Sequence, residues 1–492
     1  MPSTYDITNS RPLDVHRWSD HPEVSSFFSK VQAKYFRNVR SKRQKQALKV
    51  LLLDLYVVWQ DDPSQFIALP MSQKAYCRGS RFRSIFVDYK IIALVKQATE
   101  KGLILQISGS EWSQKVTRIR ATERLARIFR RGDLNLPIQQ SNLNRPCLIV
   151  RDMDKSNIIG WANQACGLEL AFAQKATEQL TAYNNILQNT LIDIPTAKRN
   201  KVPLGNTNKT TGWIHISDYN KFVHRVFNNA SLTKGGRFYG GWWQNAPKEL
   251  RSHIFINNLP TSEIDFSSMH INLLYAKKGL QVEEALGSTD PYMIDVPGVQ
   301  DPSLQRKLGK NLMLTAINAS DKKSCIQAFR KFIVDQGLKD HIGRLTDENL
   351  TPLLEQLMIR HRPINEFICS GVGIDLMNAD AMVASKVLEE CLKFKIIPLI
   401  IHDSFIVQQI EEPFVTNLMQ RVYQQALNSF QISTTSTYNI NLNKHMYGDQ
   451  SNLTKSNRYK LKLSKWETNI KEKLITITGK YCLNDIVYFS DS

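Results

Sequence analysis

The stretch Pro398–Gln409, PLIIHDSFIVQQ, places His402 and Asp403 between two strongly apolar runs. The runs Leu399–Ile401 and Phe405–Val407 predict two strands that are joined by a tight turn. A carboxylate at such a turn either accepts backbone hydrogen bonds or has a function, because an unpaired charge beside a core is costly. The stretch alone favours the turn interpretation, so the rest of the chain has to decide between the two.

The composition limits the class of protein. The chain has 492 residues, of which 42% are hydrophobic and 22% charged, and this is ordinary for a globular protein of roughly two to four domains. Lys and Arg outnumber Asp and Glu by 64 to 45, giving a net charge of +19 that favours nucleic acid as a partner before an anionic membrane surface. The seven cysteines lack zinc spacing, the N-terminus lacks a signal pattern, and no apolar run approaches the ~20 residues that cross a bilayer. We therefore expect a cytoplasmic protein without a membrane partner.

The first 160 residues carry basic segments. Lys30–Lys49 contains eight basic residues and no acidic one, and it leads into an apolar helix-like run. This segment fits a phosphate-facing helix and a solvated face equally well. Farther on, a helix-like segment at 88–102 is followed by two strand-like segments, at 103–108 and 115–122, in the order of a winged helix. The same order occurs in unrelated α+β domains, so a DNA-binding unit is one interpretation among others.

A second acidic strand end precedes Asp403 by 138 residues. Asp265 ends a strand-like segment and opens the apolar part of SEIDFSSMHINLLYA, residues 262–276. Two aspartates at neighbouring strand ends could hold two Mg²⁺ ions, because carboxylate oxygens suit a hard cation that keeps water and phosphate as its other ligands. Two such ions about 3.5–4 Å apart clamp the attacking and leaving oxygens of a phosphoryl transfer.

The segment between the two aspartates contains LQRKLGKNLMLTAINAS, residues 304–320. Arg306 and Lys310 are four residues apart, so on a helix they project from one face and could grip a triphosphate. Basic pairs of this spacing are also common on solvated helices. Their position between the two aspartates is what favours the functional interpretation.

The order of these segments resembles the polymerase core of family A DNA polymerases and of the related single-subunit, phage-type RNA polymerases. The resemblance covers roughly Asn228 to Gln409 and rests on GGRFYGGWWQ, EIDFSSMHINLLYA as motif A, RKLGKNLMLTAINA as motif B and IHDSFIV as motif C. It implies an α+β right-hand core of palm, fingers and thumb with an antiparallel palm sheet, preceded by the mainly helical, winged-helix-like region. It also implies two Mg²⁺ ions, with Mn²⁺ as a substitute, and primer–template DNA and nucleoside triphosphates as partners.

The resemblance also assigns roles by position. The implied catalytic residues are Asp265, Asp403 and Lys310, of which the two aspartates bind metal. The implied nucleotide-binding residues are Arg306, Lys310, Leu314, His270 and Asn318. The implied primer and template contacts are Arg237, Gly236, His402 and Asn378, and Asp290–Tyr292 matches a short acidic-aromatic element. His402 could instead be a structural residue.

Together with composition, the resemblance divides the chain into six segments. We expect a basic N-terminal region at 1–160, a thumb-like helical region with a linker at 161–215, palm segments at 216–280 and 361–435, fingers at 281–360 and a basic C-terminal extension at 436–492.

Several positions depart from the family pattern. His270 stands where DNA-making members usually carry a Glu that excludes ribose, so the sugar preference is open. Leu314 replaces an aromatic residue, and Asn318-Ala319 replaces a Tyr-Gly pair. Phe405 in motif C is closer to the RNA polymerases.

These observations favour a DNA polymerase without 3′–5′ proofreading, because the first 200 residues lack the Asp-x-Glu strand of such an exonuclease. One alternative is a single-subunit RNA polymerase. Another is a DNA-binding replication initiator or regulator with a relic polymerase core. A nuclease or transposase shares the ion chemistry but has no identifiable third acid here. A host, a phage or a mobile genetic element could each encode such a chain.

Overall fold

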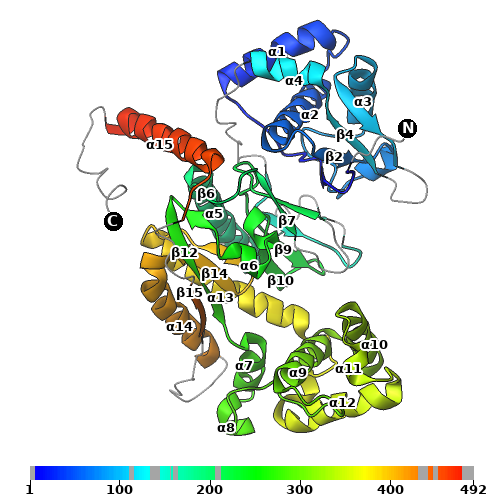
Figure 1. The fold of residues 1–492 in the computed structure, drawn as a ribbon, viewed down its shortest axis with the longest axis vertical. Coiled ribbons are helices and arrows are strands. Elements are labelled where there is room, and N and C mark those ends of the chain that lie inside the picture. Colours follow the sequence, from blue (N-terminus) through cyan, green and yellow to red (C-terminus); the bar gives the residue numbers. More distant parts are fainter. Residues whose placement is uncertain are drawn as a thin grey trace. The chain divides into compact units, whose positions relative to one another are not determined.

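The computed structural model describes residues 6–109, 116–132, 145–155, 157–158, 165–204, 212–429, 442–446 and 453–478 (Figure 1). It divides into two compact units: unit 1 comprises 1–225, 239–261 and 446–492, and unit 2 comprises 226–238 and 262–445. Helices and several sheets contribute, so the fold is mixed α and β. The six segment boundaries expected from the sequence remain predictions.

The N-terminal part of unit 1 packs helices around a small sheet. The helices are α1 (Pro22–Tyr35), α2 (Lys42–Asp61), α3 (Ile91–Glu100) and α4 (Glu123–Arg131), with a short 3₁₀ turn, η1 (Gln73–Tyr76). The strands are β1 (Ser10–Pro12), β2 (Phe66–Leu69), β3 (Ile104–Ile107) and β4 (Thr117–Ala121). Their order is β1-β2-β4-β3, with β4 antiparallel to both of its neighbours. The apolar face expected for 88–102 is confirmed, because Ile91, Leu94, Val95 and Ala98 of α3 are buried.

Only the second half of the basic segment Lys30–Lys49 is continuous with the apolar run, because both lie in α2. Helix α1 ends at Tyr35, and α2 begins after Ser41, whose side-chain oxygen accepts a hydrogen bond from the backbone N–H of Gln44. This N-cap satisfies an amide that the first helical turn would otherwise leave unpaired, which fixes the start of α2. The basic residues are therefore divided between two helices.

The rest of unit 1 consists of one long helix, several short strands and the C-terminal helix. Its helices are α5 (Gly167–Asn189), η4 (Trp242–Asn245), α6 (Lys248–Arg251) and α15 (Asn457–Thr478). Its strands are β5 (Leu148–Val150), β6 (Ile192–Asp193), β7 (Lys201–Leu204), β8 (Gly212–His215) and β11 (Phe255–Ile256). Helix α15 is tied to β6 because Arg458 and Lys462 both form ion pairs with the buried carboxylate of Asp193.

Unit 2 contains the whole of motifs A, B and C of the polymerase resemblance, together with residues 235–238 of GGRFYGGWWQ, whose remaining residues belong to unit 1. Three strands lie partly in unit 2: β9 (His224–Asn228) from residue 226, β10 (Ser231–Tyr239) up to residue 238 and β12 (Leu259–Phe266) from residue 262. The later strands are β13 (Leu399–Ile401), β14 (Ser404–Gln408) and β15 (Leu442–Met446). The helices are α7 (Met269–Ala276), α8 (Val282–Leu286), α9 (Pro302–Asn318), α10 (Lys322–Asp335), α11 (Lys339–Ile342), α12 (Asp347–Arg360), η5 (Arg362–Phe367), α13 (Gly373–Lys393), η6 (Gln409–Glu411) and α14 (Glu412–Asn428). In the sheet, β14 lies between β13 and β12, and β15 also pairs with β12.

Two groups of helices accompany this sheet. Helices α7, α13 and α14 pack on one another, and α14 also contacts β14. Helices α9, α10 and α12 form the second group, which is drawn in yellow-green in Figure 1. Among the helices that the structure describes, none has the length and hydropathy to cross a membrane.

Glu411, the last residue of η6, predicts a pH-dependent stability. Burial raises the pKa of its carboxyl to about 7. Below pH ~4.5 the folded and unfolded states are both protonated, and above pH 7 the buried charge penalises only the folded state. Glu411→Gln should therefore raise the melting temperature at pH 8 and leave it nearly unchanged at pH 4.5. An equal shift at both pH values would show that the effect is not ionisation.

Candidate functional site

The turn between β13 and β14 presents Asp403, as the two apolar runs predict. Ile401 pairs with Ser404, which leaves only His402 and Asp403 in the connection. His402 has a φ of 56°, in the left-handed region that non-glycine residues rarely adopt. Two-residue hairpin turns require a positive φ at their first central position, so the tight turn itself accounts for this conformation and presents Asp403 at its tip.

Asp265 lies on β12, the strand next to β14. Its Oδ1 atom is buried and has no hydrogen-bond partner among the residues that the structure describes, and Nε2 of His445 lies 3.6 Å from it. Burial raises the pKa of Asp265 most, a side-chain hydrogen bond with Asn443 and the interaction with His445 lower it, and the negative charges of Asp403 and Glu263 raise it, so that the net shift is upward. The two aspartates are therefore close enough to repel each other.

Asp403 is also poorly solvated. Burial is the main cause that raises its pKa, and the carboxylate of Asp380 adds to the effect, while Arg237 and His270 oppose it. A divalent cation would reverse this balance, because opposite charge favours the ionised form of a carboxyl group.

The residues present fit Mg²⁺ in its usual mode of binding. Within the described ranges, no group of three or more His, Cys, Asp or Glu forms a complete metal cage. Mg²⁺ normally takes only one or two protein carboxylates and completes its shell with water and substrate phosphate. The unpartnered Oδ1 of Asp265, close to a second desolvated carboxylate, meets that requirement.

Glu263 is a third carboxylate that the sequence interpretation did not assign. It lies two residues before Asp265 on the same strand, so both side chains share one face of the sheet. Glu263 is buried and accepts a hydrogen bond of 3.2 Å from the hydroxyl of Ser404 on β14. The signal that could have identified it is the Glu-x-Asp spacing in SEID, residues 262–265.

Arg237, His270 and Asp380 form a buried charge cluster, hereafter the Asp380 cluster. Asp380 lies on α13 with no exposed surface, and Nε of Arg237 is 3.1 and 3.0 Å from its two oxygens. Nε2 of His270 lies 2.8 Å from Oδ2 of Asp380. Because a carboxylate only accepts, Nε2 carries the proton in this pairing. The cluster thus joins three elements that are far apart in the sequence: β10 through Arg237, α7 through His270 and α13 through Asp380.

The β9–β10 hairpin is held against α13 by Asn378. Its side-chain amide donates to the carbonyls of Leu232 and Gly235, each at 3.0 Å. Gly235 and Gly236 have φ values of 70° and 93°, which side chains other than glycine rarely tolerate. The predicted primer-contacting residues Gly236 and Asn378 therefore have a structural role in shaping β10 before Arg237.

Helix α9 exposes one polar face and buries the other. Arg306, Lys310, Leu314 and Asn318 are exposed at successive intervals of four residues, while Leu308, Leu312 and Ile317 are buried. Arg306 forms an ion pair of 2.6 Å with Asp290. Arg306 and the Lys310 ammonium also lie 5.4 and 5.8 Å from the centre of the Tyr292 ring.

Tyr292 connects this face with the carboxylates. Its ring is buried under the two cations, and burial raises its pKa, while a hydrogen bond with Ser268 and the charge of Arg306 lower it. The charge of Asp403 also contributes to the raised value. Arg306 and Lys310 are thereby linked to the region of the two aspartates, whereas Leu314 and Asn318 lie farther along α9.

Gly309 allows α9 to pack directly on the backbone of Tyr292. A Cβ atom at Gly309 would lie 1.9 Å from the Tyr292 carbonyl oxygen, which requires a backbone shift. Gly309→Ala is therefore expected to lower the melting temperature, although alanine favours helix. The matched control is Lys307→Ala, an exposed change on the same helix, which should have little effect. Equal melting temperatures for the two variants would contradict the packing argument.

Neither a family model nor a curated protein matches the chain. A solved structure that is similar is the POL domain of Pol1 from M. smegmatis, determined in complex with DNA primer-template and dNTP. The two are 11% identical with a TM-score of 0.26, and the match covers 64% of this chain. It covers 60% of that structure, so this chain spans about three fifths of its length.

Proposed function

We propose that unit 2 catalyses template-directed nucleotidyl transfer, as a DNA polymerase without 3′–5′ proofreading. The observation that carries this proposal is a pair of partly buried aspartates, Asp265 on β12 and Asp403 in the turn before the neighbouring strand β14. Asp265 and Asp403 lie close enough for the charge of one to raise the pKa of the other, and an oxygen of Asp265 has no partner among the described residues. Without a cation this arrangement is unfavourable, so it supports a site that is completed by metal and substrate.

The proposed mechanism divides the work between two groups of residues. Asp265 and Asp403 would hold the Mg²⁺ ions. When bound, these ions lower the pKa of the primer 3′-hydroxyl and neutralise the pyrophosphate that leaves. Arg306 and Lys310 would bind the triphosphate, with Arg306 exchanging its present partner, Asp290, for phosphate oxygens. The reaction needs little covalent participation by the protein, because positioning and charge neutralisation lower most of the barrier.

Extension of a labelled primer on a DNA template tests the proposal. The assay compares all four dNTPs with all four NTPs in Mg²⁺, using the parent and Asp403→Ala. The matched control is Asp340→Ala, an exposed aspartate on α11. We expect extension by the parent and by the control, and none by Asp403→Ala. Extension with NTPs only would identify the RNA polymerase alternative, and no extension by the parent would contradict the proposal.

We also propose that the N-terminal part of unit 1 binds duplex DNA. The arrangement that favours this function is helix α3 preceding the antiparallel β3–β4 pair, with β2 on the other side of β4, as in winged helices. Exposed Lys42, Arg43 and Lys45 begin α2. Arg43 already pairs with Asp88 at 2.8 Å, so the test replaces Lys42 and Lys45 with alanine, which should weaken DNA binding and reduce its salt dependence by about two phosphate contacts. An unchanged salt slope would overturn this role.

A further inference from the structure

Unit 1 contains a cavity of about 780 Å³, hereafter the arginine cavity. Its walls come from the N-terminal arm at 8–16, strand β8 and the segments 145–151, 220–224 and 240–245, with Gln65, Arg81 and Asn157. All of its lining residues belong to unit 1, so it is separate from the carboxylates of unit 2. Its size is in the range of sites that hold a small molecule, about 300–1,000 Å³.

The lining of the arginine cavity is strongly basic. Four arginines face it, Arg11, Arg81, Arg145 and Arg151, and among the described lining residues the sole carboxylate is Asp14. Burial, together with the charges of Arg145 and Arg151, lowers the pKa of His224 in the same wall to about 3. The cavity therefore favours an anion.

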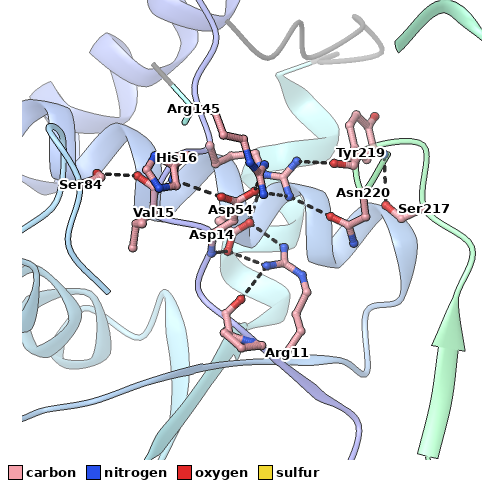
Figure 2. Close-up of polar contacts among 12 residues, drawn as sticks. Arg11, Asp14, Val15, His16, Asp54, Ser84, Arg145, Ser217, Tyr219 and Asn220 are labelled. Carbon is pink, nitrogen blue, oxygen red and sulfur yellow. Dashed lines mark hydrogen bonds and ion pairs between the residues drawn. The ribbon is translucent and has the colours of Figure 1, made fainter. Parts of the chain in front are cut away.

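A buried ion network fixes two of these arginines (Figure 2). Arg11 donates to both oxygens of Asp54, at 2.9 and 2.6 Å, and Arg145 donates to Asp14 at 3.0 Å. Arg17 contacts both aspartates and reaches the carbonyl of Tyr219 at 3.1 Å. Three arginines thus share two carboxylates, and Arg81 and Arg151 add to the excess of positive charge.

Three buried polar atoms at this cavity lack partners. Nε of Arg151, Nε1 of Trp242 and Nδ1 of His215 have no hydrogen-bond partner within the part of the chain that the structure describes. Trp242 is only 4% exposed, so its indole N–H has little access to water. Nδ1 of His215 is an acceptor, because Nε2 of the same ring donates to Oδ1 of Asn9 at 2.9 Å. The N–H groups of Arg151 and Trp242 are donors, and an unpaired buried donor costs about 1–3 kcal/mol, which a ligand that supplies acceptors would recover.

The arginine cavity also has aromatic side chains in its walls. Trp213 and Phe222 also line it, and the guanidinium of Arg145 lies 4.6 Å from the centre of the Phe222 ring. Arginines beside flat aromatic rings are the combination that binds nucleotides, since phosphates pair with guanidinium groups and bases pack on rings.

We propose that the arginine cavity binds a phosphorylated nucleotide. Arg151 and Arg81 would contact the phosphate, the Trp242 N–H would donate to an oxygen of the ligand, and Trp213 would lie beside the base. The ligand is either a free nucleoside triphosphate or the 5′-phosphorylated end of a single strand, which share this chemistry. The inference does not depend on the activity proposed for unit 2.

Equilibrium binding of labelled ATP and of labelled 5′-phosphorylated dT5 to the full-length chain tests the proposal. The buffer contains EDTA, which removes the metal ions that a triphosphate needs at the proposed unit 2 site. Unphosphorylated dT5 and inorganic phosphate are the competitors. We expect binding of at least one probe, and competition by unphosphorylated dT5 should be weak. Tighter binding of ATP would identify a free nucleotide, and tighter binding of phosphorylated dT5 would identify a strand end.

Variants locate the binding. Arg151→Ala should weaken it by about 10–100-fold, as expected for one charge-assisted hydrogen bond. Trp242→Phe keeps an aromatic side chain, removes the N–H donor and should weaken binding by about 2–10-fold, which covers the case that Arg151→Ala does not fold. The matched control Arg199→Ala, exposed elsewhere in unit 1, should bind like the parent, and Lys310→Ala reports any binding at the proposed triphosphate site of unit 2. The proposal is overturned if no probe binds, or if inorganic phosphate competes as well as ATP. It is also overturned if binding occurs elsewhere, which normal binding by both Trp242→Phe and Arg151→Ala, or loss of binding in Lys310→Ala, would show.

Discussion

An Asp265→Asn protein is expected to lose at least ~100-fold of its primer-extension rate while folding at least as stably as the parent without metal. Even a residue that only orients a metal ligand typically contributes about 10–100-fold, and Asp265 is proposed to be a ligand itself. The stability expectation has a separate cause. In the metal-free protein, partial burial and the charges of Asp403 and Glu263 disfavour the Asp265 carboxylate more than Asn443 and His445 favour it, so a neutral amide of the same shape removes a net unfavourable interaction.

Thermal unfolding with and without metal separates the two effects. The samples contain Mg²⁺, primer–template with a dideoxy end and the matching dNTP, so that no turnover occurs. The parent should gain stability from Mg²⁺, because a ligand that binds only the folded state stabilises it. Asp265→Asn should gain much less, and the control Asp340→Asn should behave like the parent. Full activity of Asp265→Asn would remove this residue from the proposed metal site, whereas lost activity with a lowered melting temperature would indicate damage to the fold.

The local parts of the site could be predicted from the sequence. Apolar runs on both sides of His402-Asp403 predict the hairpin, since strands and tight turns depend on neighbouring residues. The exposed row on α9 also follows from the four-residue spacing of Arg306, Lys310 and Leu314. These patterns are visible because each is contained within one element.

The partners across the fold were harder to predict. Glu263 and Ser404 are 141 residues apart, and they meet only because β12 lies beside β14. His445 reaches Asp265 through β15, which pairs with the same strand. Periodicity in one sequence carries no information about which strands become neighbours. The break between α1 and α2 has a different, local signal, the N-cap residue Ser41, which the high charge of the surrounding segment obscures.

The burial of Asp380 could have been predicted from the sequence, because this residue lies on an apolar face of a helix. It lies on the same apolar face of α13 as Val383, Ala384 and Val387, all of which are buried. A carboxylate in such a stripe has to be paired, because an isolated buried charge is too costly. The pattern therefore indicates a buried ion pair, but it does not identify Arg237 and His270, which come from β10 and α7.

Asp380→Ala is expected to destabilise the fold more than any other substitution proposed above, by about 3–5 kcal/mol. Removing one partner of a buried ion pair costs this much because the remaining charge is left without compensation. Arg237 is only 17% exposed at its side chain and would lose its carboxylate partner, and His270 would lose the acceptor of its Nε2 proton. Chemical denaturation of the parent, Asp380→Ala, Arg237→Ala and the double variant measures the coupling. The sum of the two single effects should exceed the effect of the double variant, and simple additivity would show that the pair does not interact.

Asp380→Asn should then reveal whether the Asp380 cluster also affects catalysis. The amide keeps the shape of the side chain and removes its charge, so Arg237 and the His270 imidazole lose the group that fixes their orientation. Because His270 stands at the position that discriminates the sugar in the polymerase resemblance, the ratio of kcat/KM for dNTPs to that for NTPs should change at least severalfold. The matched control is Asp375→Asn, also on α13, which pairs with Lys234 at a more exposed position. A lower rate with an unchanged sugar ratio in Asp380→Asn would limit the cluster to a structural role.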